Sequence, residues 1–171
     1  MIRLYRILRK AYGHSPFDGE GAYRYGGRWS SSGTRLSYTS EHQSLAMLEY
    51  FVHMDPADPP EDLILASADV PENVSRERVL ATALPSNWRS TPAPAALLRF
   101  GDQFVTKGKS CCLVVPSALS PRENNWLLNP QHADFGKIVV LPAEPLRYDP
   151  RMFVTNQHRR KHASAKPRKS L

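Results

Sequence analysis

Apolar and polar positions along the chain follow a two-residue period in some segments and a helical period in others. They predict strands at residues 2–8, 35–39, 63–70, 110–116 and 137–141, and an edge strand at 145–149. They also predict helices at residues 44–54 and from residue 92 to a stop at Gly108, since glycine commonly ends helices. The segments 10–34 and 71–90 are predicted to be irregular.

These elements predict an α+β domain with mostly antiparallel strands around a cleft and few helices. The chain has 171 residues, which is enough for one sizeable core and short for two. Apolar residues make up 41% of the chain, and prolines outnumber glycines by 15 to 9. We therefore expect one compact domain that is rich in loops.

The helix predicted at 44–54 has a polar start and one unusual face. Ser40 is predicted to be its N-cap, with Gln43 completing a capping box. At 3.6 residues per turn, one face carries Leu45, Leu48, Glu49 and Val52. A carboxylate on an apolar face is costly to bury unless it is paired or used. Glu49 is therefore either half of a buried ion pair, with Arg28 or another arginine, or a carboxylate that lines a cleft.

Arg28 and Tyr38 precede Glu49 in an order that favours the cleft. Arg28 follows Gly26 and Gly27, which allow the backbone to approach a ligand closely. Tyr38 lies in the strand that leads into the helix. The three side chains could converge on one pocket as a phosphate or ribose grip, a stacking ring and a negative charge.

Arg6 lies among apolar residues on a strand that we expect to be central. On one face of that strand it stands between Leu4 and Leu8. One interpretation is a structural salt bridge, for example to Glu49. The other is a contact to phosphate or ribose, because the fixed fork of a guanidinium suits anionic oxygens.

Seven short motifs, in their order along the chain, resemble the RES domain, the toxin half of a family of bacterial toxin–antitoxin pairs. They are Leu4-Tyr5-Arg6, Gly26-Gly27-Arg28-Trp29-Ser30, Tyr38-Thr39-Ser40, Leu48-Glu49, Phe100-Gly101-Asp102, Val115-Pro116-Ser117-Ala118 and the stretch from Asn124-Asn125 to Leu128-Asn129-Pro130-Gln131-His132. Each motif is weak alone, but the ordered set is specific and covers residues 2 to about 150. Ser30 stands where the family frequently has asparagine.

The resemblance implies a compact relative of the ADP-ribosyltransferase fold that acts on NAD+. Members degrade NAD+ by hydrolysis or phosphorolysis, or transfer ADP-ribose to a protein. The signature arginine, tyrosine and glutamate of the family fall on Arg28, Tyr38 and Glu49, which we expect to be catalytic. The expected NAD+-binding residues are Arg6, Arg28, Tyr38 and Ser117, the last of which follows a strand end that borders the pocket in the family. The acceptor, whether water, phosphate or a protein side chain, stays open.

The resemblance also implies a partner, a small helical antitoxin with an Xre-like DNA-binding region that blocks the pocket. The oligomeric state stays open, a homodimer included. Cys111 and Cys112 are adjacent, so we expect neither an ordinary disulfide nor a metal site. His132 is either a general base or a structural hydrogen-bonding residue.

Charge is concentrated at the C-terminal end. The formal net charge is +7, and residues 154–171 hold six basic residues and no acid, which leaves 17 basic and 16 acidic residues in 1–153. We therefore predict a RES domain at 1–153 and a disordered basic tail at 154–171. The tail is either a solvated extension or an electrostatic arm for weak contact with nucleic acid or an acidic partner.

Two other classes of function stay open beside an NAD+-consuming enzyme. One is a nucleic-acid-binding module that uses the tail, and the other is a non-catalytic protein-interaction domain. No apolar run is long enough to span a membrane. Charged residues near the N-terminus stand where a signal peptide needs an apolar core, so we expect a cytoplasmic protein without membrane contact.

Overall fold

One eight-stranded sheet organises the computed structural model, which describes residues 1–153. The tail predicted at 154–171 lies outside the described residues. The strands are β1 (Ile2–Arg9), β2 (Ser37–Ser40), β3 (Leu63–Val70), β4 (Arg76–Arg78), β5 (Cys112–Pro116), β6 (Asn124–Leu128), β7 (Val139–Val140) and β8 (Glu144–Pro145). Their order in the sheet is β4-β5-β6-β2-β1-β3-β7, and β8 also pairs with β3. All pairs are antiparallel except β4 with β5, so the predicted α+β class is confirmed.

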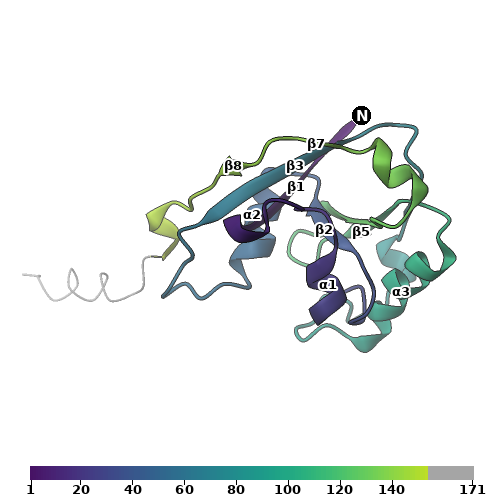
Figure 1. Ribbon diagram of the computed structural model, residues 1–171. Coiled ribbons are helices and arrows are strands. Elements are labelled where there is room, and N and C mark those ends of the chain that lie inside the picture. The colour runs from purple at the N-terminus through teal and green to yellow at the C-terminus, as the bar shows by residue number, and fades with distance from the viewer. Residues whose placement is uncertain (154–171) are drawn as a thin grey trace, which may run out of the picture.

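Few helices accompany the sheet. They are α1 (Glu20–Tyr25), α2 (Gln43–Phe51) and α3 (Leu98–Lys107), with short 3-10 turns η1 (Lys10–Tyr12), η2 (Ala81–Ala83), η3 (Ala95–Leu97), η4 (Ala133–Lys137) and η5 (Pro150–Phe153). Figure 1 shows α2 near the long β1–β3 pair, with α1 and α3 toward the other end of the molecule. Gly108 ends α3 as predicted, in the left-handed conformation with φ 56°. Within residues 1–153, none of the helices is both long and apolar enough to cross a membrane.

β1 lies at the centre of the sheet and faces two apolar clusters. Leu4 and Leu8 pack in one cluster with Phe17, whereas Ile7 packs in another cluster against α2. Because successive side chains of a strand point to opposite faces, Arg6 lies on the Leu4 and Leu8 face. The strand is buried on both faces, as its central position requires.

The sheet is weakly joined between β1 and β2. β1 pairs with β3 over its whole length, from Ile2 to Arg9. β2 likewise pairs with β6 at all four of its residues. Between β1 and β2, however, only Tyr5 and Ser40 are paired. The two strands therefore diverge beside Arg6, and the sheet opens there.

One helix and two strands, α1, β4 and β6, were not predicted from the sequence, and β4 lies within the segment 71–90 that was predicted to be irregular. α1 lies within the segment 10–34, where a six-residue helix is too short to show a helical period. The carboxylate of Asp18 helps to start it by accepting the backbone N–H of Glu20 at 2.9 Å. β6 begins with Asn124 and Asn125, whose polarity conceals a strand that pairs on both sides. The strand predicted at 137–141 is only the two-residue β7. The edge strand predicted at 145–149 was wrong, because β8 is Glu144–Pro145 and residues 146–149 are irregular.

The prediction for the start and the buried face of α2 was partly wrong. Ser40 belongs to β2, and His42 occupies the N-cap position without a side-chain cap bond. Leu45 is buried as predicted, but Leu48 and Val52 are 39% and 49% exposed. The helix instead packs through Ala46 and its neighbours against β1 and β3, which rotates Leu48 and Val52 into solvent. Glu49 therefore lies at the boundary of the buried face.

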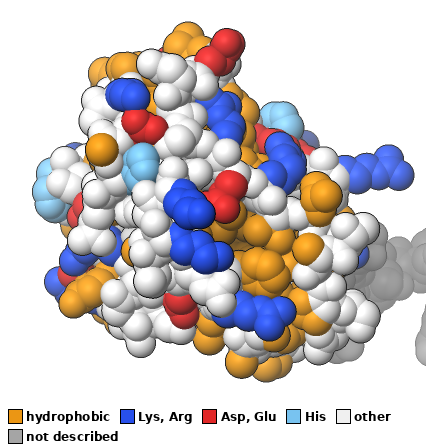
Figure 2. All heavy atoms as spheres, turned by 90° about the vertical axis from the view of Figure 1, so that its right-hand side faces the viewer, with side chains coloured by type: hydrophobic (Ala, Val, Ile, Leu, Met, Phe, Trp, Pro, Cys, Tyr) orange, Lys and Arg blue, Asp and Glu red, His pale blue; other side chains and the backbone are white. Residues whose placement is uncertain are grey.

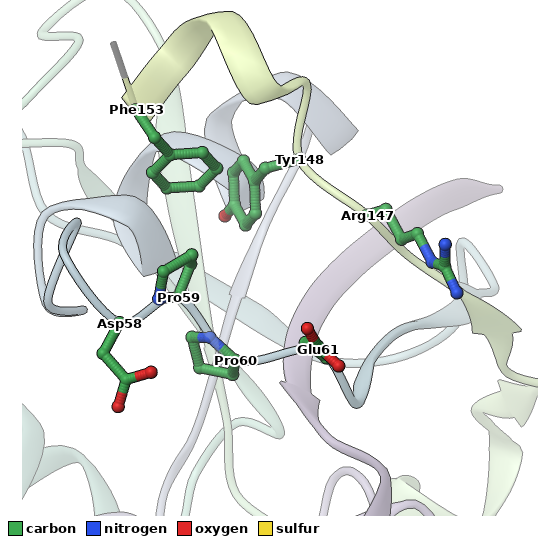
Figure 3. Close-up of a pocket in the computed structure, with 7 residues that line it drawn as sticks. All are labelled: Asp58, Pro59, Pro60, Glu61, Arg147, Tyr148 and Phe153. Carbon is green, nitrogen blue, oxygen red and sulfur yellow. The ribbon is translucent and has the colours of Figure 1, made fainter. Parts of the chain in front are cut away.

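Residues near the end of the described chain pack against α2. The Tyr148 hydroxyl donates to the Met47 carbonyl oxygen at 2.6 Å, and burial raises the pKa of this tyrosine to about 12. A pocket of about 360 Å³ lies next to this contact. In Figure 3 the rings of Tyr148 and Phe153 form one wall of it, with Pro59 nearby and the Asp58 carboxylate below. No predicted site residue lines this pocket.

Candidate active site

A small pocket between α2 and the β1–β2 strands contains three of the predicted site residues. It has a volume of about 160 Å³ and is lined by Arg6, Tyr38 and Glu49. Ser40 and Tyr50 complete much of the remaining wall. The pocket lies beside the place where β1 and β2 diverge, so a weak junction in the sheet coincides with the predicted chemistry.

Glu49 is held by hydrogen bonds at one oxygen only. Its Oε1 accepts from Ser117 Oγ at 2.8 Å and from Asn125 Nδ2 at 2.6 Å. Within residues 1–153 its Oε2 has no hydrogen bond, and Glu49 forms no ion pair. The buried-ion-pair interpretation is therefore wrong for the described chain. The carboxylate is fixed at one oxygen while the other is available to a ligand.

Ser117 supports the carboxylate from the end of β5. It is fully buried, and its Oγ also accepts the N–H groups of Leu119 and Ser120, both at 3.1 Å. With two N–H donors occupying the oxygen, the hydroxyl proton is directed to Glu49. In this structure Ser117 contacts Glu49 and does not line the 160 Å³ pocket.

Asn125 is a functional candidate that the sequence analysis did not single out. It lies on β6 opposite Ser40 of β2, so both side chains lie on the same face of the sheet. Ser40 Oγ donates to Asn125 Oδ1 at 2.7 Å, which turns the amide nitrogen toward Glu49. Asn125 was part of a quoted motif, but its direction could be known only once β6 was placed beside β2.

Tyr38 presents its ring to the pocket while its hydroxyl is held by the preceding loop. The hydroxyl oxygen accepts the Trp29 N–H at 3.1 Å and lies 2.9 Å from Ser30 Oγ. Gly27 packs against this hydroxyl so closely that a Cβ there would lie 2.5 Å from it. Burial raises the pKa of Tyr38, so the phenol is neutral at physiological pH. Gly27 thus has a packing role against Tyr38.

Asp102 fixes the loop that carries Arg28 and Trp29. Its carboxylate accepts the Ser31 N–H at 2.9 Å, the Ser31 hydroxyl at 2.7 Å and the Thr34 hydroxyl at 2.7 Å. Trp29 is buried beneath the loop, as expected for a packing residue. The hydroxyl of Tyr38 is therefore held by a loop that is itself anchored to α3.

Arg28 is half-buried and does not line the 160 Å³ pocket. Its Nη1 donates to the carbonyl oxygens of Trp88 at 2.9 Å and Ser90 at 3.2 Å. The structure therefore brings Arg6, Tyr38 and Glu49 together, with Ser117 behind Glu49. Arg28 lies apart from them, although its backbone adjoins the loop that holds Tyr38.

Arg6 is a half-buried cation that forms no ion pair with a carboxylate among the described residues. Its Nη1 donates to the Pro16 carbonyl oxygen at 2.9 Å and to Ser37 Oγ at 2.8 Å. Burial lowers the pKa of its guanidinium and the nearby Asp18 opposes this shift, but an arginine remains protonated at neutral pH. Within residues 1–153 Arg6 forms no salt bridge to Glu49, and a half-buried cation without an ion pair favours an anionic ligand.

The remaining candidates have structural roles in the described chain. His132 Nδ1 accepts the backbone N–H of Asp134 at 3.0 Å and caps η4, which supports the structural interpretation. Cys111 and Cys112 are both buried and form no disulfide. Residues 1–153 contain no group of three or more His, Cys, Asp and Glu side chains that could hold a metal ion.

The chain resembles known proteins over most of its length. The model of the RES domain family matches residues 3–149. The chain is 38% identical to Toxin Res of Yersinia enterocolitica over 153 residues. The matched region covers 88% of this chain and 99% of that protein. It is 39% identical over 136 residues to Toxin Res of Photorhabdus laumondii, covering 80% and 86%, respectively. It is also 34% identical over 145 residues to the Prs ADP-ribosylating toxin of a Sphingobium species, covering 84% and 90%.

A solved structure shares the fold at low sequence identity. A chain in the crystal structure of the Mycobacterium tuberculosis MbcT–MbcA toxin–antitoxin complex has a TM-score of 0.69 and 16% identity, covering 89% of this chain and 86% of that chain. The expected resemblance in fold is confirmed by this match and by the family model. On the evidence of sequence and fold together, the chain belongs to the RES domain family.

Proposed function

We propose that the chain is the NAD+-consuming toxin of a bacterial toxin–antitoxin pair and cleaves the bond between nicotinamide and ribose. The observation that carries the proposal is the state of Glu49, with Oε1 held by Ser117 and Asn125 and Oε2 available in a pocket. The names of the relatives support the class, since one is an ADP-ribosylating toxin and others are called Toxin Res. ADP-ribosylation uses NAD+ as the donor.

Cleavage of the nicotinamide–ribose bond requires a negative charge beside the cation that develops on the ribose. The bond from ribose C1′ to the nicotinamide nitrogen breaks, and its electron pair neutralises that nitrogen. The ribosyl group then resembles an oxocarbenium ion, and the negative charge of the Glu49 carboxylate stabilises it. Glu49 Oε2 can also accept a hydrogen bond from a ribose hydroxyl. The acceptor oxygen forms the new bond to C1′ and releases its proton. Water gives ADP-ribose, phosphate gives its phosphorylated form, and a protein side chain gives a modified protein.

Tyr38, Arg6 and Arg28 are proposed to hold the rest of the substrate. The ring of Tyr38 stacks on nicotinamide, and its anchored hydroxyl fixes the plane of the ring. Arg6, whose guanidinium forms no ion pair within residues 1–153, binds the pyrophosphate. Arg28 uses Nη1 for two loop carbonyls, and its other guanidinium nitrogens form no hydrogen bond with residues 1–153. It is therefore able to grip ribose or pyrophosphate while remaining attached to the loop.

The proposed partner is an antitoxin that covers the pocket. The match to a chain in a toxin–antitoxin complex supports a partner of this class for the present chain. The Xre-like character and the pocket-blocking mode come from the family resemblance. Since NAD+ is a cytoplasmic metabolite, the proposed reaction places the toxin in the cytoplasm, where a protein acceptor would also be found.

The nucleic-acid alternative depends on the tail at 154–171, which lies outside the described residues. Residues 1–153 hold 17 basic and 16 acidic residues, so this part is nearly neutral. Figure 2 shows one face of it, on which Lys and Arg side chains are interspersed with acidic and apolar ones. A domain that binds nucleic acid through its folded surface would be expected to carry a basic stripe.

The purified chain, free of antitoxin, is expected to release nicotinamide from NAD+. Chromatography of reactions with and without phosphate follows nicotinamide and identifies the ribosyl product. If ADP-ribose is the only ribosyl product, the acceptor is water. If a phosphorylated ribosyl product forms, the acceptor is phosphate. If folded protein releases no nicotinamide, even with a cell extract as a source of protein acceptors, the proposed enzyme is wrong and a non-catalytic interaction domain is favoured.

Replacing Asn125 by alanine is expected to lower kcat more than it raises KM. The change removes the 2.6 Å hydrogen bond that positions Glu49 Oε1 and leaves the substrate-facing side chains in place. A hydrogen bond to a charged group contributes about 1.5–3 kcal/mol, so a loss of about 10- to 100-fold in kcat is expected. Steady-state kinetics of nicotinamide release measure both constants.

Ser40→Ala is the matched comparison for Asn125. It removes the bond to Asn125 Oδ1 and one hydroxyl of the pocket wall but leaves the Asn125 amide beside Glu49, so it should have a smaller effect on kcat. An Asn125→Ala variant with an unchanged kcat, or with a loss only in KM, would contradict the positioning role. Circular dichroism of both variants controls for folding.

A further inference from the structure

A second, larger pocket adjoins Arg6. It has a volume of about 430 Å³ and is built mainly from the segment 12–25, between η1 and the end of α1. Arg6 is the one residue that lines both this pocket and the 160 Å³ pocket beside Glu49. Among the side chains around it are Tyr12, His14, Asp18, Arg24 and Tyr25.

The pocket beside Glu49 is too small for a dinucleotide. Pockets that enclose drug-sized ligands typically measure about 300–1,000 Å³, and NAD+ is larger than most such ligands. A pocket of about 160 Å³ can enclose the nicotinamide end but not the adenosine end as well. The rest of the substrate must therefore lie elsewhere on the surface, and it must be reached from the Glu49 pocket.

The position of Arg6 provides that connection. Its side chain leaves β1 next to Tyr5, the single position at which β1 and β2 are paired, and it donates to Ser37 Oγ across the diverging strands. A pyrophosphate bound to the unpaired guanidinium would lie between the two pockets. One end of the dinucleotide could then enter each pocket.

The charges of the larger pocket suit an adenylate. Glu20 is neutralised by two arginines, because Arg24 Nε donates to its Oε1 and Arg35 Nη1 donates to its Oε2, each at 2.6 Å. These contacts lower the pKa of Glu20. Because the negative charge of Glu20 is neutralised, the positive charges of Arg6 and Arg24 make this region favourable for binding a phosphate group. Asp18 uses Oδ1 for the Glu20 N–H, and Oδ2, which has no hydrogen bond with residues 1–153, can accept a ribose hydroxyl.

Two tyrosines supply stacking surfaces. Tyr12 is 65% exposed and Tyr25 is 84% exposed, although both line the pocket. Rings that remain this exposed contribute little to the core and can stack on a base. Tyr23, on the same helix as Tyr25, differs because the Arg35 guanidinium lies 4.4 Å from its ring centre and Tyr23 does not line the pocket.

We propose that the 430 Å³ pocket is the adenylate subsite, with the pyrophosphate at Arg6 and the adenine against Tyr12 and Tyr25. The inference rests on the proposed function, because it locates the second half of the same substrate. It makes the chain selective for a dinucleotide over nicotinamide mononucleotide, which ends at one phosphate. Its specificity then comes from the segment 12–25, outside the Glu49 pocket.

The test compares NAD+ with nicotinamide mononucleotide as substrates for the Tyr12→Ala, Tyr25→Ala and double variants. Loss of base stacking is expected to lower kcat/KM for NAD+ by about tenfold or more in the double variant. The value for nicotinamide mononucleotide should stay within about twofold of the unmodified chain, because this substrate has no adenine to stack. Tyr23→Ala is the control and should leave both values unchanged. Equal losses for both substrates, or no loss for NAD+, would overturn the subsite.

A binding measurement keeps this test separate from the proposed reaction. Calorimetry with AMP is expected to show binding to the full chain and to Glu49→Gln, and binding weakened about tenfold or more in the double tyrosine variant. Unchanged AMP binding in the double variant, or none to the full chain, would overturn the subsite whether or not NAD+ is consumed. Failure of turnover with normal AMP binding would count against the proposed reaction alone.

Discussion

Glu49→Gln is expected to lower nicotinamide release from NAD+ by about 10²- to 10³-fold, as is typical when a group that stabilises transition-state charge is removed. The glutamine oxygen can still accept from Ser117 and Asn125, so the local hydrogen bonds are preserved. The negative charge and the free accepting oxygen are lost. Initial rates at saturating NAD+ measure the effect, and thermal unfolding shows whether the fold is intact.

Glu77→Gln provides a matched control for this change. Glu77 lies on β4 at the edge of the sheet, is exposed, and lines none of the pockets described above. The same loss of one charge should leave its activity unchanged. Full activity in Glu49→Gln would rule out the carboxylate as the stabilising charge and, with it, the proposed mechanism.

Gly101→Ala is expected to destabilise the fold by about 1–3 kcal/mol, the usual effect of overpacking a dense interior. Gly101 is buried, and its N–H donates to the Trp29 carbonyl oxygen at 2.9 Å. An added Cβ would overlap that oxygen and lie 2.9 Å from Leu36 Cδ1. The carbonyl has little freedom to move, because Asp102 ties down the same loop. Urea unfolding gives the free energy of unfolding.

Gly136→Ala tests whether that effect comes from packing. A Cβ at Gly136 would meet no atom within 4 Å, so this variant should change stability by no more than about 0.5 kcal/mol. Equal stability of the two variants would contradict the proposed overlap. Because the Trp29 loop also holds the Tyr38 hydroxyl, Gly101→Ala should lower activity along with stability.

The sequence predicted most of the sheet and the helix that carries Glu49, because long apolar segments and a glycine stop leave clear patterns. β1, β3 and β5 lie where those patterns predict them. The second helix ends before Gly108 as predicted, but α3 begins at Leu98 after η3 and not at residue 92. The family resemblance named Arg6, Tyr38 and Glu49, which line one pocket. The periodicity of apolar residues could not have predicted that these residues share a pocket, because a pocket depends on which strands are neighbours in the sheet.

The errors have a common physical origin in tertiary packing. Helical spacing alone grouped Leu48 and Val52 with Leu45, but the position of β1 and β3 decides which side of α2 is buried. Asn125 was overlooked for the same reason, because its polarity marks β6 as a loop until Ser40 is placed opposite it. Capping statistics favoured Ser40 as the helix start, but its hydroxyl is used by Asn125 instead.

The support of α2 by Tyr148 has a consequence for the order in which the protein is made. The Tyr148 hydroxyl reaches Met47, which lies 101 positions earlier in the chain. A nascent chain on the ribosome must therefore extend past residue 148 before the Glu49 helix can gain this contact and its aromatic backing. Domains fold as units as they emerge from the ribosome. The active conformation of this toxin is thus completed only when nearly the whole domain has been synthesised.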